Sequence, residues 1–81
     1  MNSAQVQEEV SLLWRKVLPE GEFDQYSDFI SAGGNSLKVI SLFVQIMKKF
    51  NVKLEIKNFA RLNTINNQAD FISNEIRRRN A

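Results

Sequence analysis

Three segments of this chain repeat their apolar residues at the spacing of an α-helix, and this periodicity constrains the fold most. They cover residues 3–18, 36–50 and 64–79. In each, apolar residues recur three and four positions apart, which places them on one side of a helix. Residues 57–62 suffice for one further helical turn. We therefore predict an all-α fold, a small four-helix bundle with three main helices and a short third helix.

Residues with strong local preferences mark the ends of these segments. Ser3 is a predicted N-cap, and Pro19 with Gly21 stops the first helix. Asn35 is a predicted N-cap, so the second helix opens at Ser36. Asn51 follows that helix, and asparagine tolerates the left-handed conformation that ends helices. Residues 63–64 offer a cap for the last helix. Residues 52–56 alternate like a strand but lack a partner strand, so we expect an extended connector.

The apolar surface of the second predicted helix is unusually wide. Its apolar residues are Leu37, Val39, Ile40, Leu42, Phe43, Val44, Ile46, Met47 and Phe50. One contact with a core does not require so broad a face, so we expect part of it to meet another protein.

A long connection, residues 19–35, separates the first two helices. Connections of this length are usually functional or disordered. Phe23, Tyr26 and Phe29 are spaced along it, and we expect these aromatic residues to pin it to the core. Phe29 and Ile30 would set the angle of the following turn, as a hydrophobic staple does.

The connection ends in Gly33-Gly34-Asn35-Ser36, which places a serine at a helix start. The glycines permit positive φ or a close backbone approach, or serve only as a turn. Unpaired amides and the helix dipole favour an anion at this point, so the Ser36 hydroxyl is well placed to carry a phosphate ester. We interpret Ser36 as a residue that is modified, not as a catalytic nucleophile, because the chain has no His and no Cys.

Composition excludes several functional classes. Without Cys or His, the chain has no disulfide framework, thiolate nucleophile or Cys/His zinc site, and we predict no catalytic residue and no metal site. It has no paired-carboxylate motif and no phosphate-binding Gly-Lys-Ser/Thr loop. No apolar run approaches the roughly 20 residues of a membrane span, and no signal-peptide pattern opens the sequence. We expect a cytoplasmic, non-enzymatic protein without a membrane partner.

The net charge of +2 is unevenly distributed. Residues 1–35 carry −4, residues 36–61 carry +5 and the remainder carries +1. The basic middle is compatible with nucleic-acid binding, but we interpret it as the solvated faces of two helices and expect no nucleic-acid partner. We interpret the arginines at 77–79 as complementing a helix dipole in a solvated tail.

Taken in order, these residues resemble the carrier-protein superfamily, and above all the peptidyl carrier (thiolation) domains of non-ribosomal peptide synthetases. Residues 33–37 stand where that family has Gly-Gly-His/Asp-Ser-Leu/Ile, and residues 29–32 where it often has Phe-x-x-Leu. Residues 48–54 look like its basic-basic-Phe-Gly-Val-x-Leu, with asparagine at the usual glycine. Phe59 and residues 64–65 look like its third-helix Phe and its fourth-helix Thr-Ile/Val entry. The likeness covers nearly the whole chain.

Two departures from the family pattern bear on function. Asn35 replaces the usual His or Asp, which affects recognition by the modifying enzyme, although asparagine still caps a helix. Glu55 stands where many relatives have Pro, and the resemblance implies that this substitution would loosen the turn before the third helix. The basic middle also departs from the acidic second helix typical of fatty-acid carriers.

The resemblance implies one carrier domain over residues 1–81, with a four-helix fold and a long first loop. Ser36, flanked by Gly33, Gly34 and Asn35, would receive 4′-phosphopantetheine from coenzyme A through a phosphopantetheinyl transferase. The arm would hold an aminoacyl or peptidyl thioester and present it to adenylation, condensation and thioesterase or other tailoring domains. A monomer is expected.

Four residues near Ser36 are candidates for partner contacts. Leu37 and Ile40 are equally compatible with a core position, and Phe59 fits the core better. Lys38 is adjacent to the phosphate position and would meet the phosphate, an acidic partner or water.

Other interpretations stay open at this stage. One is an acyl carrier for polyketide, fatty-acid or D-alanine chemistry. Another is a carrier-like interaction module that is never modified. A third is a helical nucleic-acid-binding module, which gives Gly33-Gly34-Asn35-Ser36 no role.

Overall fold

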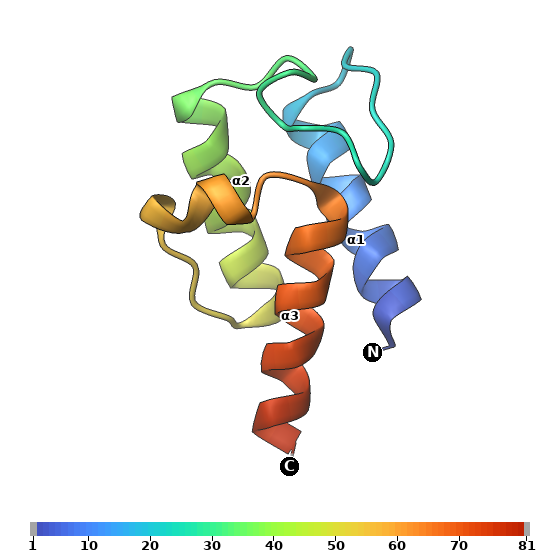
Figure 1. Cartoon of the computed structure of the whole chain (residues 1–81), viewed down its shortest axis with the longest axis vertical. Helices are drawn as coiled ribbons and strands as arrows, with labels where there is room; N and C mark the ends of the chain where they lie inside the picture. Colours follow the sequence, from blue (N-terminus) through green and yellow to red (C-terminus); the bar gives the residue numbers. More distant parts are fainter. Residues whose placement is uncertain (1, 81) are drawn as a thin grey trace.

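The computed structural model describes residues 2–80 and shows a helical bundle (Figure 1). Within these residues there is no strand, which confirms the predicted all-α fold. The elements are α1 (Ser3–Val17), α2 (Ser36–Phe50), the 3₁₀-helix η1 (Ile56–Arg61) and α3 (Ile65–Asn80). α1 packs against both α2 and α3 and runs opposite to them, while η1 packs against α2. Met1 and Ala81, the ends of the predicted domain, lie outside the described residues.

The helix ends follow the predicted caps with one correction. The N-cap of α1 is Asn2, because its side-chain oxygen accepts from the Gln5 amide at 2.9 Å while Gln5 bonds back to the Asn2 amide at 3.0 Å. Ser3 is already helical, so its prediction as N-cap was wrong. Asn35 caps α2 as predicted, and Asn51 ends it at φ 54° in the left-handed region.

The last two elements begin one residue from their predicted starts. η1 covers Ile56–Arg61 where we predicted residues 57–62, and α3 begins at Ile65 because Thr64 remains its cap. The Thr64 hydroxyl accepts from the Asn67 amide at 3.0 Å. The preceding connector is extended and unpaired, as expected.

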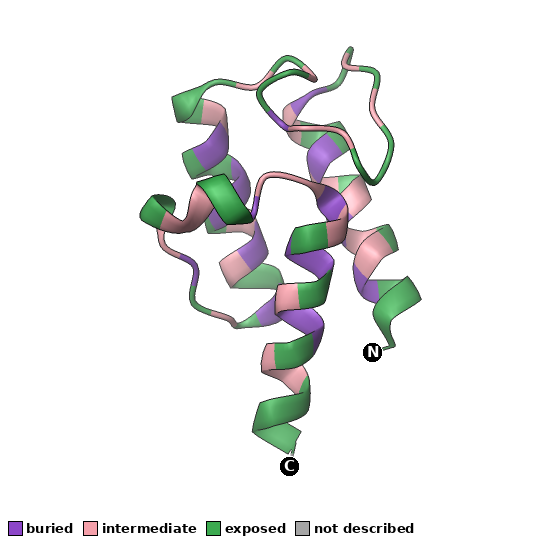
Figure 2. Ribbon diagram, in the orientation of Figure 1, coloured by how far each residue is buried: buried purple, intermediate pink, exposed green. Residues whose placement is uncertain are grey.

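One face of each α-helix contributes to a single core, whose buried residues are purple in Figure 2. The buried apolar residues are Val6, Val10, Trp14, Leu18, Phe29, Val39, Leu42, Phe43, Ile46, Phe50, Leu54, Leu62, Ile65, Ala69 and Ile72.

The apolar residues of α2 divide between this core and the solvent. Leu37, Ile40 and Val44 retain 79%, 46% and 38% of their surface exposed. Those on the opposite side of the helix are buried. The prediction that α2 has more apolar surface than the core uses is therefore confirmed.

A buried hydrogen-bond chain joins three elements at the centre of the bundle. Trp14 Nε1 donates to Gln68 Oε1 at 2.9 Å, and Gln68 Nε2 donates to the Leu62 carbonyl at 2.7 Å. Gln68 is 1% exposed. Because a buried amide without partners is costly, this chain fixes how α1, η1 and α3 meet.

The aromatic residues of the loop do not behave alike. Phe29 is fully buried and meets the Trp14 ring edge-on, with centroids 4.9 Å apart. Phe23 is partly buried, and its ring centroid lies 5.2 Å from that of Trp14. The Arg15 guanidinium lies over the Phe23 ring. Tyr26 is 69% exposed, so the expectation that it pins the loop was wrong.

The end of α3 is tied to the end of α2. Arg79 donates to the carbonyl oxygens of Asn51 and Phe50 at 2.8 and 2.9 Å. These carbonyls lack partners within a helix, so the guanidinium satisfies the C-terminus of α2. Arg79 is exposed, as the interpretation of a solvated tail implied, but it also caps α2, which that interpretation did not include. No helix among residues 2–80 is long and apolar enough to cross a membrane.

Candidate functional site

Ser36 is the first residue of α2, and its side chain is exposed. Asn35 satisfies two amides of the first turn, because its side chain accepts from Lys38 N and its carbonyl from Val39 N, both at 2.9 Å. Within residues 2–80, the amides of Ser36 and Leu37 have no such partner. Two free donors and the positive end of the helix dipole thus adjoin the hydroxyl, and an ester phosphate there would be stabilised.

The two glycines before the site are required for different reasons. Gly33 has φ 115°, a conformation that side chains strongly disfavour. Gly34 lies against Phe29, and a Cβ at position 34 would fall 2.8 Å from the Phe29 carbonyl oxygen and closer still to its ring. Both predicted uses of glycine, positive φ and close approach, therefore occur here.

Asp28 holds the loop that presents the site. Its carboxylate accepts from the Ser31 amide at 3.0 Å and from Asn63 Nδ2 at 2.5 Å. The Phe29 amide donates to the Asn63 carbonyl at 2.9 Å. These bonds, that of the Ser31 amide first and that of the Asn63 amide second, lower the pKa of Asp28. The loop is thereby joined to the chain that leads into α3.

A mostly apolar cavity of about 310 Å³ opens beside Ser36. It lies between the end of the loop, the first turns of α2 and η1. Ile40 and Phe59, both predicted contact residues, line it. The full lining is Ile30, Ser36, Val39, Ile40, Ile56 and Phe59.

The predicted contact residues thus have distinct positions. Phe59 is partly buried against Phe29 and Phe43, with ring centroids 6.3 and 6.0 Å away, so it is both core and cavity wall. Leu37 is exposed and does not line the cavity. Lys38 lies on the other flank of Ser36, in a cavity of about 290 Å³ shared with Leu18, Pro19, Glu20, Gly21, Ala32 and Gly33.

Two cavity residues were missed from the sequence. Ile30 is 45% exposed and Ile56 is 48% exposed. Ile30 was assigned to a staple, and Ile56 was placed in the connector. Their common signal was a bulky aliphatic residue directly beside a turn.

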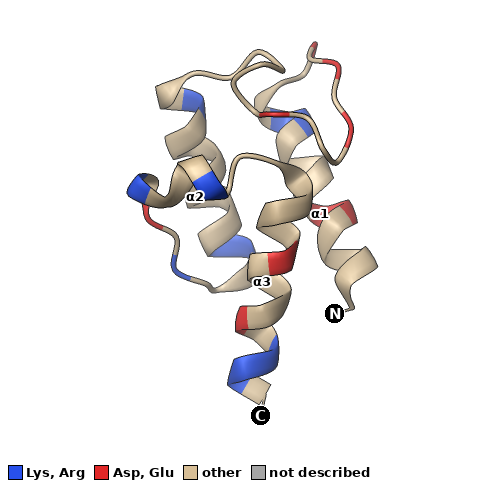
Figure 3. Ribbon diagram, viewed as in Figure 1, with Lys and Arg blue, Asp and Glu red and all other residues tan. Residues whose placement is uncertain are grey.

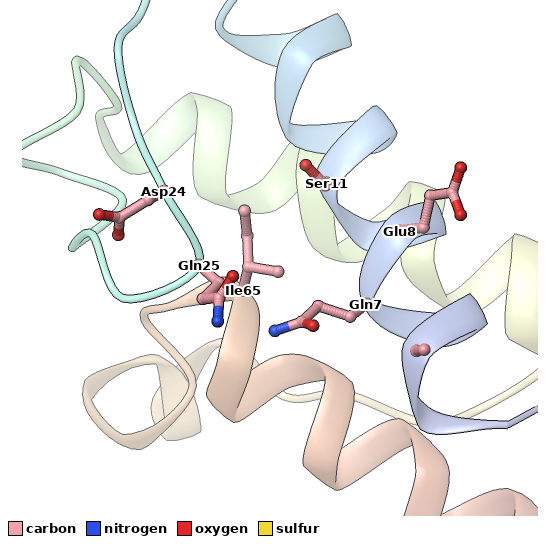
Figure 4. Close-up of a pocket in the computed structure, with 7 residues that line it drawn as sticks. Gln7, Glu8, Ser11, Asp24, Gln25 and Ile65 are labelled. Atoms are coloured by element: carbon pink, nitrogen blue, oxygen red, sulfur yellow. The ribbon is translucent and has the colours of Figure 1, made fainter.

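A more polar pocket of about 300 Å³ lies between α1 and the loop (Figure 4). Its lining is Ala4, Gln7, Glu8, Ser11, Asp24, Gln25 and Ile65. It contains none of the predicted site residues.

Among residues 2–80, no strong general base adjoins the Ser36 hydroxyl. The chain has no histidine, and Asp28 is bound by two donors and has a lowered pKa, so it is a poor base. Among residues 2–80 no group of three potential metal ligands lies together.

Comparison with known sequences places the chain in a family. A sequence model described as "phosphopantetheine attachment site" matches residues 8–72. The chain is 34% identical over 67 residues to Fusarin C synthetase of Gibberella fujikuroi, covering 80% of the chain and 2% of the synthetase. It is 27% identical over 71 residues to Gramicidin S synthase 2 of Brevibacillus brevis, covering 88% of the chain and 2% of the synthase. The chain thus spans about one-fiftieth of these relatives.

Two solved structures share the fold. BlmI, a type-II acyl-carrier protein from Streptomyces verticillus involved in bleomycin biosynthesis, aligns with a TM-score of 0.81 at 18% identity, over 91% of this chain and 89% of that one. An active-site mutant peptidyl carrier protein aligns with a TM-score of 0.80 at 23% identity, over 93% of this chain and 81% of that one.

Proposed function

The chain belongs to the phosphopantetheine attachment site family of carrier domains, and on that premise we propose that Ser36 carries the 4′-phosphopantetheine arm. The observation that carries the proposal is the position of the Ser36 hydroxyl, exposed at the free-amide end of α2 behind a rigid glycine turn. The residues fit a phosphodiester, because two free amides and the helix dipole face the place where its charge would lie.

Attachment would join the Ser36 oxygen to the β-phosphorus of coenzyme A and release 3′,5′-adenosine bisphosphate. The hydroxyl proton would pass to a base of the transferase, since Asn35 is neutral and engaged as a cap. The arm, when bound, supplies a thiol that holds cargo as a thioester. This chain contributes position and recognition, without catalysis of its own.

We assign aminoacyl or peptidyl cargo to the arm, with adenylation, condensation and thioesterase or tailoring domains as partners. The identity with Gramicidin S synthase 2 and Fusarin C synthetase supports this assignment. An acyl cargo of polyketide chemistry is the second candidate, favoured by 32% identity over 71 residues to a hybrid PKS-NRPS synthetase of Aspergillus flavus. The domain would act as a monomer in the cytoplasm.

Leu37, Ile40 and Phe59 would provide the apolar part of partner recognition. Leu37 and Ile40 are exposed on α2, and Ile40 and Phe59 share the cavity beside Ser36. Lys38 lies on the opposite flank, where it would meet the phosphate or an acidic side chain.

Intact mass after incubation with coenzyme A, Mg²⁺ and a broad-specificity phosphopantetheinyl transferase tests the proposal. We expect the native chain to gain one phosphopantetheine and Ser36→Ala to gain none. Ser31→Ala is the matched control, because this loop serine is also exposed and should leave the modification intact. A Ser36→Ala variant that is still modified would contradict the assignment.

A negative result with one transferase is resolved through Asn35. Asn35→Asp restores a residue usual in the family and keeps an oxygen that caps α2. If neither the native chain nor this variant is modified by two unrelated transferases, the chain is an unmodified interaction module. If either chain is modified, loading of the holo protein by amino-acid-activating or acyl-activating enzymes separates the two cargo candidates.

A further inference from the structure

The surface around Ser36 combines exposed aliphatic side chains with an excess of positive charge. We call its apolar part the aliphatic face, formed by Ile30, Leu37, Ile40, Val44 and Ile56, which are 38–79% exposed. Ile30, Ile40 and Ile56 converge on the cavity beside Ser36, and Leu37 and Val44 continue along the outer side of α2. Side chains of this kind, exposed together, mark a docking surface for another macromolecule.

The charged residues within the two helices beside this face are all cations. α2 contains Lys38, Lys48 and Lys49 and no acid, and η1 contains Lys57 and Arg61 and no acid. Figure 3 shows acidic residues on the loop, on α1, on α3 and just before η1, whereas the charged residues on α2 and η1 are all basic. The positive end of the α2 dipole, at Ser36, adds to the same field.

The positions of three of these cations indicate which side chains a partner on the aliphatic face would contact. Lys48 stands eleven residues after Leu37, three full turns along α2, and so continues the stripe formed by Leu37 and Val44. Lys57 directly follows Ile56 at the cavity rim, and its side chain is 77% exposed. Lys49 is directed elsewhere, because it pairs with Glu9 of α1 at 2.7 Å.

Little negative charge offsets these cations. Glu55 lies 3.1 Å from the Lys57 ammonium, an exposed pair that solvent screens. Lys38, Lys48 and Arg61 make no salt bridge within residues 2–80.

We infer that the aliphatic face selects partner proteins whose docking surface is an apolar depression rimmed by carboxylates. This inference rests on the proposed function, since it concerns the enzymes that act on Ser36. Opposite charge at the rim accelerates encounter and disfavours basic-faced competitors, while the aliphatic centre supplies the contact area. A nucleic acid fits less well, because its phosphates would meet Leu37, Ile40 and Val44 at the centre of the surface.

Two purified phosphopantetheinyl transferases test this selection, one with an acidic and one with a basic carrier-docking surface. The readout is kcat/KM for arm transfer at low and high salt. We expect added salt to lower kcat/KM with the acidic-faced enzyme more steeply than with the basic-faced enzyme. The double variant Lys48→Glu/Lys57→Glu should lose about tenfold with the acidic-faced enzyme at low salt and gain with the other.

The matched control is Lys16→Glu/Arg77→Glu, which changes the net charge equally. Both control residues are exposed cations in the last turns of other helices, as Lys48 is in α2. This control should stay within about twofold of the native chain. Equal effects of the two double variants, or equal salt responses of the two enzymes, would overturn the inference.

Two further results distinguish failure of the charge selection from failure of the proposed function, and a protein partner from a nucleic acid. Arm transfer to Ser36 that goes to completion in every variant would leave the proposed function standing even if the charge selection failed. Salt-sensitive binding of a labelled DNA duplex that depends on Lys48 and Lys57 would overturn the protein partner in favour of a nucleic acid. Thermal melts of all variants are the control that each remains folded.

Discussion

Gly34 lies directly against the buried ring of Phe29, and this contact sets the angle at which the chain enters α2. The Gly34 amide also donates to the Phe29 carbonyl at 3.0 Å. A methyl group at position 34 would overlap the ring and approach that carbonyl oxygen to 2.8 Å. The position of Ser36 therefore depends on the packing of a residue seven positions earlier.

The first prediction concerns the two glycines. Gly34→Ala should lower the free energy of unfolding by about 1–3 kcal/mol through overpacking. Gly33→Ala should lower the free energy of unfolding by about 1–3 kcal/mol through backbone strain at φ 115°. A steric clash would not contribute, because no atom lies within 4 Å of a Cβ placed at position 33. Urea denaturation measures both.

A second background separates the two mechanisms. Phe29→Leu removes the ring, so Gly34→Ala should cost less in that background while the cost of Gly33→Ala stays the same. Equal costs of Gly34→Ala in both backgrounds would argue against the contact with the ring.

The second prediction concerns the buried amide of Gln68. Gln68→Leu leaves Trp14 Nε1 and the Leu62 carbonyl without partners, and it should destabilise the fold by about 2–4 kcal/mol. In a Trp14→Phe background the same change should cost less, because one orphaned donor is gone. A double-mutant cycle from thermal or urea unfolding gives the coupling, and its absence would contradict the hydrogen-bond chain.

The third prediction concerns acid stability. Because hydrogen bonds lower the pKa of Asp28 in the folded state, this carboxylate stabilises the fold above its ordinary pKa of about 3.8. That contribution is lost as the pH falls from there through the folded pKa. Asp28→Asn should be less stable than the native chain at pH 7, and the difference should shrink in acid. Measurement of Tm as a function of pH tests this prediction. Asp70→Asn, at an exposed position of α3, is the control. Curves of Tm against pH that run parallel for Asp28→Asn and the native chain would refute it.

The fourth prediction separates contact residues from core residues on α2. Leu37→Ala removes a side chain that is 79% exposed, so the free energy of unfolding should change by less than about 0.5 kcal/mol. Its kcat/KM with a transferase should fall about tenfold, because a contact made only with the partner is lost. Leu42→Ala, at a fully buried position, should instead destabilise by about 2–5 kcal/mol. A stable Leu37→Ala variant with native kinetics would remove Leu37 from the interface.

The fifth prediction concerns the tie between α3 and α2. Arg79→Ala removes two donors from the Phe50 and Asn51 carbonyls and should cost about 0.5–1 kcal/mol. Arg78→Ala, which removes only an exposed local pair with Glu75, should cost close to nothing. Denaturation of the two variants by guanidinium chloride measures these losses in the free energy of unfolding. Equal losses for Arg79→Ala and Arg78→Ala would mean that Arg79 does not cap α2.

Local sequence preferences predicted most of the helices and the place of the candidate site. Apolar periodicity predicted α1, α2 and α3, and Asn35 and Asn51 marked both ends of α2, because caps and turn residues act over three or four positions. The likeness of residues 33–37 to a carrier motif singled out Ser36 and its flanking residues. Those features can be read from neighbouring letters alone.

Contacts between distant parts of the chain were decided only by the tertiary structure. Nothing in the sequence distinguished Gln68 from the other polar residues of the last helix, but it is buried and bonds to Trp14, 54 positions earlier. Arg79 read as part of a solvated tail, yet it caps a helix that ends 29 positions before it. Which apolar residues of α2 stay exposed likewise depends on where α1 and η1 pack. Sequence periodicity fixes a helix and its faces, whereas burial and long-range hydrogen bonds follow from how those faces meet in three dimensions.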